Sequence, residues 1–179
     1  NRLTQKGEAV ITGFGLEGNA IYGLSPEIRK ELALNGLAEI VVDLKPSLSV
    51  EVIFNKLSKS TAKNTSEKLK KDLKLSSVQL ELLKNNSSKE VFMDLRLLAK
   101  NIKTLQLNIV STAPLDEGIS CVGGIELGDL SDTYELSEIP NHYCIGEMLD
   151  WDAPTGGYLL QACFSMGVTV AKSLNNLKI

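Results

Sequence analysis

Residues 143–158, YCIGEMLDWDAPTGGY, decide the fold that we expect for the end of this 179-residue chain. A short apolar run over residues 143–145 predicts an extended segment that ends at Gly146. Glycine has no Cβ, so a ligand can approach the backbone closely at that point. The next residue, Glu147, supplies a carboxylate that can accept hydrogen bonds from hydroxyl groups. The pattern indicates a strand end that faces a polar ligand.

The second half of this stretch predicts the start of a helix that runs over residues 155–174. Small residues recur along this helix and would allow close packing against a strand or a ligand; they are Gly157, Ala162, Gly167 and Ala171. A helix start has free backbone N–H groups and the positive end of the helix dipole, which suit an electron-rich ligand edge. From the residues alone, an ordinary glycine-rich turn before an amphipathic helix remains the alternative.

The rest of the chain mixes strands and helices, which predicts an α+β fold. Residues 8–12, 38–44 and 104–112 show strand patterns, and the last of these alternates apolar with polar residues. Ser25-Pro26 begins a helix that ends before Gly36. Residues 48–103 predict a block of four helices, in which Ser49, Ser76-Ser77 and Ser88 are candidate N-caps. Short extended pieces are expected at residues 119–122 and 143–145.

Gly13-Phe14-Gly15-Leu16-Glu17-Gly18 matches the GxGxxG pattern of dinucleotide-binding folds and follows a predicted strand. We nevertheless predict a glycine-rich turn here. The helix that this motif should open would meet Ser25-Pro26 after about two turns, and proline breaks a helix interior. The following helical block also shows no parallel-strand pattern. A nucleotide-binding fold built on these three glycines is therefore the weakest of the alternatives.

Charge is distributed unevenly, although the net charge is only −3. Residues 55–103 hold eleven lysines and Arg96 against five acids, whereas residues 104–171 hold ten acids and no lysine or arginine. The basic segment could bind a partner protein or nucleic acid, which would make the chain a stand-alone interaction module. We favour a solvated helical face, because Phe92 is the only aromatic residue in the segment and offers no platform for stacked bases. Nucleic acid is not an expected partner.

Three cysteines and one histidine leave little scope for a metal or a catalytic triad. The cysteines, Cys121, Cys144 and Cys163, are odd in number and unpatterned, which is typical of the reducing cytoplasm. With no CxxC and only His142, no metal site is expected. His142 lies in a turn pattern and is expected to be a solvated loop residue. No apolar run is long enough for a membrane span, and the first residues do not form a secretory signal.

Several segments in order resemble the bacterial BaiN-like, or aminoacetone-oxidase-like, NAD(P)/FAD-dependent oxidoreductases. The stretch GEMLDWDAPTGGYLLQACFSMG, residues 146–167, is similar to that family's terminal flavin motif. Residues 15–22, GLEGNAIY, resemble its glycine-rich segment, and residues 41–46, VVDLKP, resemble a strand end. Residues 114–125, PLDEGISCVGGI, resemble the strand and Gly-Gly loop that precede the flavin motif. The resemblance covers nearly the whole chain.

The resemblance implies a split architecture. Residues 1–46 would begin a small β-barrel-like inserted domain, residues 47–103 would be a helical insertion, and residues 104–118 would return to the barrel. Residues 119–179 would form the terminal strand and helix of a split FAD-binding α/β domain. The family's first FAD-binding segment, with its phosphate-binding fingerprint, has no counterpart here. Together with the absent initiator Met, this predicts the carboxy-terminal part of a longer protein, inactive by itself.

The resemblance also implies the site and its partners. The flavin would be FAD, held jointly with the missing N-terminal part of the same protein, and the parent enzyme would move hydride to or from a small organic substrate. No catalytic residue is assigned, because the flavin carries the redox chemistry; Tyr158 and Cys121 are the nearest candidates. We expect a bacterial, cytoplasmic protein. The residues expected to contact the flavin are Gly146, Glu147, Thr155, Gly156, Gly157 and Tyr158, together with Gly123 and Gly124.

Overall fold

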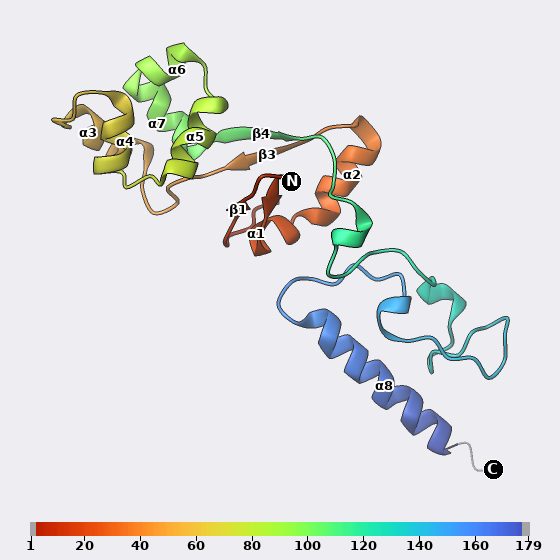
Figure 1. The fold of residues 1–179 in the computed structure, drawn as a ribbon. Coiled ribbons are helices and arrows are strands. Elements are labelled where there is room, and N and C mark those ends of the chain that lie inside the picture. The colour runs from red at the N-terminus through yellow and green to blue at the C-terminus, as the bar shows by residue number, and fades with distance from the viewer. Residues whose placement is uncertain (1–2, 177–179) are drawn as a thin grey trace. The chain divides into compact units, whose positions relative to one another are not determined.

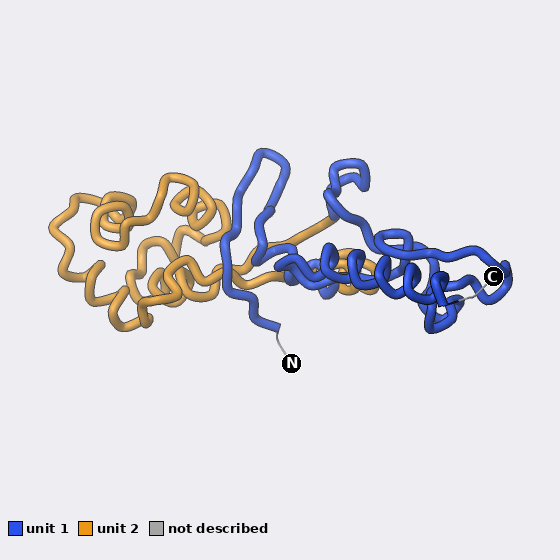
Figure 2. Tube along the Cα trace, turned by 90° about the horizontal axis from the view of Figure 1, so that it is seen from below, with its two compact units in different colours: residues 1–27, 112–179 blue, residues 28–111 orange. Residues whose placement is uncertain are grey.

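The computed structural model describes residues 3–176, which form two compact units. One unit is Ile28–Ser111, and the other combines the segments on either side of it (Figure 2). The α+β class is confirmed, since helices and short strands alternate along the chain (Figure 1). Within the described residues the strands form two separate two-stranded antiparallel sheets and no closed barrel. The four-segment domain division stays a prediction.

The first sheet is a small hairpin that contains the GxGxxG sequence. Strand β1 (Val10–Ile11) pairs antiparallel with β2 (Leu16–Glu17), and the Thr12 N–H donates to the Gly15 carbonyl at 2.9 Å across the turn. At Gly18, φ is +103° and a Cβ would lie 2.6 Å from the Glu8 carbonyl oxygen, so only glycine fits. A four-residue helix, α1 (Asn19–Tyr22), follows. The motif is thus a glycine-rich turn and not a phosphate loop, as predicted, although the turn joins two paired strands before the short helix, and the second strand was not predicted.

The second sheet confirms the alternation predicted for residues 104–112. Helix α2 (Ser25–Asn35) ends at Gly36, whose φ of +68° caps it, and leads into strand β3 (Ala38–Val42). Strand β4 (Leu105–Ile109) pairs with β3 in antiparallel register, with Ile40 opposite Leu107. Both of these side chains are buried, whereas the neighbouring residues point to solvent. One face of this two-stranded sheet therefore belongs to the core of its unit.

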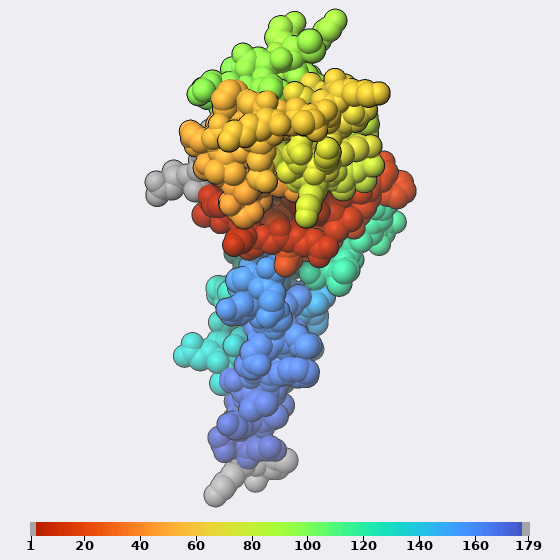
Figure 3. Space-filling view, turned by 90° about the vertical axis from the view of Figure 1, so that its left-hand side faces the viewer, coloured from red at the N-terminus to blue at the C-terminus, as the bar shows by residue number. Residues whose placement is uncertain are grey.

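Five helices form a compact block that carries the main core, seen as one continuous orange, yellow and green mass in Figure 3. They are α3 (Val50–Ser58), α4 (Thr65–Asp72), α5 (Ser77–Asn85), α6 (Lys89–Met93) and α7 (Leu95–Lys103). Helix α3 packs on α4 and α7. Each fully buried leucine or isoleucine stabilises the fold by about 1.5–3 kcal/mol. The largest buried side chains are Ile53, Leu57, Leu69, Leu80, Leu83, Leu98, Ile102 and Leu105.

Side-chain caps set the helix boundaries, and one boundary differs from the prediction. Ser49, Ser76 and Ser88 each accept a hydrogen bond from a first-turn N–H, as predicted. The fourth predicted helix is in fact two, α6 and α7. Asp94 separates them because its backbone is extended and its carboxylate accepts from the N–H groups of Arg96 and Leu97 at 2.7 and 3.0 Å. An N-cap inside the apolar periodicity therefore restarts the helix.

The segment after β4 has little regular structure before its last helix. It contains three short turns of 3₁₀-helix, η1 (Leu115–Glu117), η2 (Leu127–Asp129) and η3 (Gly146–Met148), and then α8 (Tyr158–Asn176). The strand predicted at residues 119–122 is absent, and Ile119 is 98% exposed. Helix α8 begins three residues later than predicted, and none of its side chains is buried. Across residues 3–176, no helix combines the length and apolar character needed to cross a bilayer.

Candidate functional site

Two segments that the sequence separates by more than twenty residues lie side by side in the C-terminal region. Ile125 and Leu149 form a parallel β-bridge. The Ile125 N–H donates to the Met148 carbonyl at 2.9 Å, and the Asp150 N–H donates to the Ile125 carbonyl at 2.8 Å. Leu149 is buried beneath this contact. The structure thus brings the predicted Gly-Gly loop next to the residues that follow Gly146.

The Gly-Gly loop is held by contacts that only glycine permits. At Gly124, φ is +151° and a Cβ would overlap the carbonyl oxygen of Met148. At Gly123, φ is +96°, and its N–H donates to the carboxylate of Asp150 at 3.0 Å. Sequence reasoning did not single out Asp150. Its position one residue beyond the bridging Leu149 became informative only once the bridge itself was known.

Gly146 lies directly on helix α8. Its φ is +75°, its N–H donates to the Met166 sulfur at 3.4 Å, and a Cβ there would lie 3.5 Å from the sulfur of Cys163. The carbonyl of Gly146 accepts from the Leu149 N–H at 3.2 Å, which closes the η3 turn. The hydrogen bond to Met166 holds the turn against the helix, and the space beside Gly146 is bounded by the Cys163 sulfur. Neither Met166 nor Cys163 was expected from sequence to support the site.

Glu147 leaves this turn as an exposed carboxylate. It lies in η3 and forms no ion pair or hydrogen bond with any residue in the range 3–176. Its acceptor oxygens are therefore free for hydroxyl groups of a ligand. The preceding Cys144 is buried, and its N–H donates to the Tyr134 carbonyl at 3.0 Å. The sequence predicted a strand end at Gly146; the structure has an extended Ile145 followed by the η3 turn, which exposes the Glu147 carboxylate. The role of Glu147 toward a ligand stays a prediction.

The other predicted residues gather at the N-terminus of α8. Gly156 and Gly157 have φ values of +107° and +90°, and a Cβ on Gly157 would meet nothing within 4 Å. The Gln161 N–H donates to the Gly157 carbonyl at 3.0 Å, so the helical pattern starts there. Thr155 is exposed, as is Tyr158. The first N–H groups of a helix have no acceptor within it, so this open end can receive acceptor atoms of a ligand.

The predicted residues thus form two groups along one helix. Gly123, Gly124, Gly146 and Glu147 belong to the group supported by Cys163 and Met166, and the residues from Thr155 to Tyr158 form the group at the helix end. Cys163 and Met166 lie five and eight residues after Tyr158, which is roughly 8 and 12 Å along the axis. A ligand that contacts both groups must therefore be elongated.

No group of three or more metal-ligating side chains occurs within the described part of the chain. Cys121 is exposed and its thiol contacts only the Leu115 carbonyl at 3.8 Å. His142 is exposed in a turn, with Nδ1 at 3.0 Å from the Pro140 carbonyl, as expected for a loop residue. The geometry suits ligand binding through backbone amides and one carboxylate.

Comparisons with known proteins agree with the resemblance seen in the sequence. Residues 1–120 match the family described as the HI0933-like protein barrel and H2TH domain. The chain is also 25% identical over 178 residues to the 3-dehydro-bile acid delta(4,6)-reductase of Clostridium scindens, a match that covers 93% of this chain. The matched region is only 44% of that reductase, so the chain spans under half the length of this relative. The family match covers about two thirds of the chain, and the chain therefore belongs to the HI0933-like family, the BaiN-like flavoproteins that its sequence resembles.

Proposed function

We propose that this chain is the C-terminal part of an FAD-dependent oxidoreductase and that it supplies the closing part of the flavin site. The observation that carries the proposal is the pair of residue groups on α8: an anchored Gly146-Glu147 turn and an open, glycine-preceded helix end. The proposal is also supported by a matched relative that is named as a reductase and is more than twice as long as this chain. The parent enzyme would transfer hydride to or from a small organic substrate.

The residues present fit an FAD molecule. Glu147 would accept hydrogen bonds from ribityl hydroxyl groups, and Gly146 lets that chain approach the backbone. Gly156, Gly157 and the first N–H groups of α8 would face electron-rich atoms at the edge of the flavin ring. When bound, FAD supplies the hydride-transfer chemistry, with a nicotinamide nucleotide as the proposed co-substrate. The chain's own residues then position the flavin, and none of them needs to act as an acid or a base.

An unpartnered face of α8 supports the proposal that a further part of the protein completes this site. Leu160, Phe164 and Val168 recur every four residues and are 60%, 63% and 51% exposed. Residues four apart lie on one side of a helix. Within the described residues this apolar stripe packs against nothing that buries it. We propose that the upstream FAD-binding part of the same protein covers it.

The test is to purify this chain and a longer protein that includes the residues upstream of it, and to compare their visible spectra. The proposal predicts flavin absorbance bands for the longer protein and none for the chain alone. If the longer protein is folded but colourless and takes up no added FAD, the flavoprotein assignment is wrong.

A single substitution in the longer protein tests the assigned role of Glu147. Glu147→Gln should weaken FAD binding by about tenfold or more, because hydrogen bonds to a charged acceptor are the stronger ones. Glu138→Gln is the matched control, since Glu138 is also exposed in the same acidic segment. Equal dissociation constants for FAD in the two variants would show that Glu147 does not bind the flavin.

A further inference from the structure

The corner between α3 and α4 is the most basic part of the molecule. We define this α3–α4 corner as residues 56–74, which contain two acids, Glu67 and Asp72. The segment spans the end of α3, the connecting loop and all of α4. Its seven lysines are Lys56, Lys59, Lys63, Lys68, Lys70, Lys71 and Lys74.

The two acids of the corner do not neutralise these lysines. The Glu67 carboxylate accepts hydrogen bonds from the Lys63 backbone N–H at 3.2 Å and from the Asn64 side-chain amide at 2.9 Å. It is therefore committed to the start of α4, where Asn64 is the N-cap. Asp72 has one carboxylate oxygen buried without a hydrogen-bond partner. Neither acid forms an ion pair with a lysine of the corner, so the seven lysines outnumber the two acids and the corner keeps a net positive charge.

The lysines themselves are unpaired. The ion pairs that the structure places in this unit join Lys84 to Glu81 at 3.3 Å and Lys103 to Asp43 at 2.6 Å, both outside the corner. None of the seven corner lysines forms an ion pair with any carboxylate of residues 3–176. Lys71 contacts only the Thr61 hydroxyl, at 3.5 Å. Ammonium groups without partners produce a positive field that extends into solvent.

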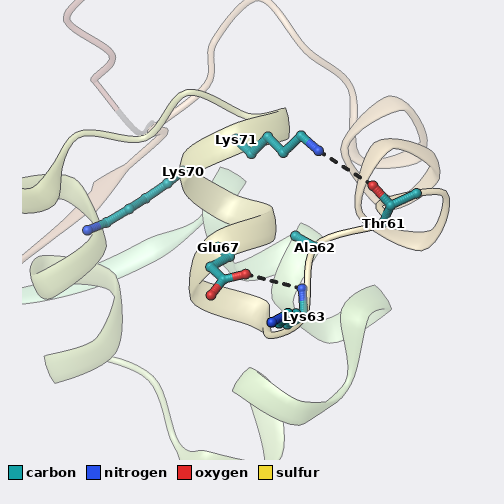
Figure 4. Close-up of a pocket in the computed structure, with 6 residues that line it drawn as sticks. All are labelled: Thr61, Ala62, Lys63, Glu67, Lys70 and Lys71. Atoms are coloured by element: carbon teal, nitrogen blue, oxygen red, sulfur yellow. Dashed lines mark hydrogen bonds between the residues drawn. The ribbon is translucent and has the colours of Figure 1, made fainter.

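Two of these lysines, Lys70 and Lys71, point away from each other beside a shallow hollow. The hollow lies between the loop and α4 and is lined by Thr61, Ala62, Lys63, Glu67, Lys70 and Lys71. Figure 4 shows the side chains of Lys70 and Lys71 extending to opposite sides of α4. A compact anion such as free phosphate would reach one ammonium group at a time. Spaced cations suit a polymer that carries evenly spaced negative charges.

The residue types in and around the corner narrow the class of polymer. Lysine is depleted at protein–protein interfaces, which disfavours an acidic protein. Base edges are read mainly by arginine, and the one arginine of this helical block, Arg96, lies 4.5 Å over the ring of Phe54. This contact also covers an aromatic face that could otherwise stack on an unpaired base. The polymer that these lysines fit best is a nucleic-acid double helix, whose phosphate backbone they would contact without sequence preference.

We propose that the α3–α4 corner binds the phosphate backbone of double-stranded nucleic acid. This goes beyond the flavin site and does not depend on it. It also revises the expectation from sequence, which favoured a merely solvated face. The revision rests on the hydrogen bonds that hold Glu67 at the start of α4 and on the unpaired lysines, neither of which composition reveals.

The experiment titrates the 179-residue chain into a fluorescently labelled 20-base-pair DNA duplex of arbitrary sequence at several salt concentrations. Binding should weaken steeply with salt, with a slope of about −0.9 in log–log form for each phosphate contacted. The triple variant Lys63→Gln/Lys70→Gln/Lys71→Gln should lose about tenfold or more in affinity, and its slope should fall by about three. Circular dichroism confirms that the variant is folded.

The control carries the same charge change elsewhere: Lys6→Gln/Lys30→Gln/Lys172→Gln should bind within about twofold of the original chain. A matching single strand should bind more weakly than the duplex. The proposal is overturned if the chain does not bind the duplex, if both triple variants lose the same affinity, or if the single strand binds more tightly. An acidic protein such as polyglutamate that competes better than the duplex would also overturn it.

Discussion

The helical block α3–α7 and the C-terminal region of residues 112–176 differ in how they are stabilised. The block buries a continuous set of leucines and isoleucines, several of them completely. Helix α8 is nineteen residues long and buries none of its side chains. A long helix therefore does not by itself give a region a buried core. The block carries its own core, whereas the C-terminal region leaves an apolar face of α8 exposed.

The same contrast extends to the backbone. Helices α3, α4, α5 and α7 of the block begin at side-chain caps, formed by serine, asparagine or aspartate. The C-terminal region instead concentrates left-handed glycines at Gly123, Gly124, Gly146, Gly156 and Gly157. Such positions allow close approach of the backbone to another group. The block therefore has regular, capped helices, whereas the C-terminal region has several positions at which another group can approach the backbone.

The largest expected effect is in the block. Leu57→Ala removes a fully buried side chain between α3 and its neighbours and should lower the free energy of unfolding by about 2–5 kcal/mol. Leu160→Ala, on the exposed stripe of α8, should change it by less than about 0.5 kcal/mol. Urea denaturation followed by circular dichroism measures both. Similar losses of unfolding free energy for the two variants would contradict the claim that the block and α8 differ in how they are stabilised.

A smaller effect is expected at the Gly-Gly loop. Gly124→Ala places a Cβ against the Met148 carbonyl in a left-handed backbone and should cost of order 1–3 kcal/mol locally. Amide exchange at Ile125 and Asp150, whose N–H groups form the bridge, should speed up. Gly128→Ala is the matched control because nothing lies within 4 Å of its Cβ position. Unchanged exchange at Ile125 in the Gly124 variant would show that the bridge does not depend on this glycine.

A helix cap in the block should have a still smaller effect on stability. Ser76 and Gln79 form a reciprocal capping box at the start of α5. Ser76→Ala should destabilise the block by about 1 kcal/mol. Ser77→Ala, one residue along, removes no capping hydrogen bond and serves as the control. Thermal melts of the two variants should therefore differ, with the lower midpoint for Ser76→Ala.

The smallest effect is a pH dependence confined to the block. The backbone N–H groups of Leu97 and Arg96 donate to the Asp94 carboxylate and hold its pKa below its ordinary value of 3.8. A lowered folded-state pKa stabilises the fold above the unfolded pKa, and this stability is lost as pH falls through the folded value. The melting temperature should therefore drop below about pH 4. Asp94→Asn keeps a capping oxygen but does not titrate, so its melting temperature should depend less on pH over this range.

Much of the helical block was predictable from sequence, because helix starts and helical periodicity depend on residues that are close together in the chain. Apolar periodicity together with Ser49, Ser76 and Ser88 located three helix starts correctly. The division at Asp94 was missed because the apolar pattern continues across it, while the cap depends on the backbone conformation of one residue. The antiparallel pairing of β3 with β4 joins strands more than sixty residues apart, which no local pattern specifies.

The site was predictable only in part, for the same reason. Gly146 and Glu147 were predicted from the strand-end pattern, and Pro26 together with the absent parallel-strand pattern argued against a phosphate loop at residues 13–18. The bridge between Ile125 and Leu149, the role of Asp150 and the support from Met166 all require long-range contacts. The strand expected at residues 119–122 failed to form, since its apolar residues find no partner within the described chain.

The most direct test of the account is amide hydrogen exchange on the chain alone and on the longer protein loaded with FAD. In the chain alone, α8 amides should exchange quickly, because no buried side chain holds the helix in place. In the loaded longer protein they should slow by about a hundredfold or more, while amides of α3–α7 change little. Strong protection of α8 in the chain alone, or no added protection in the longer protein, would contradict the claim that this region is completed by an upstream part and its flavin.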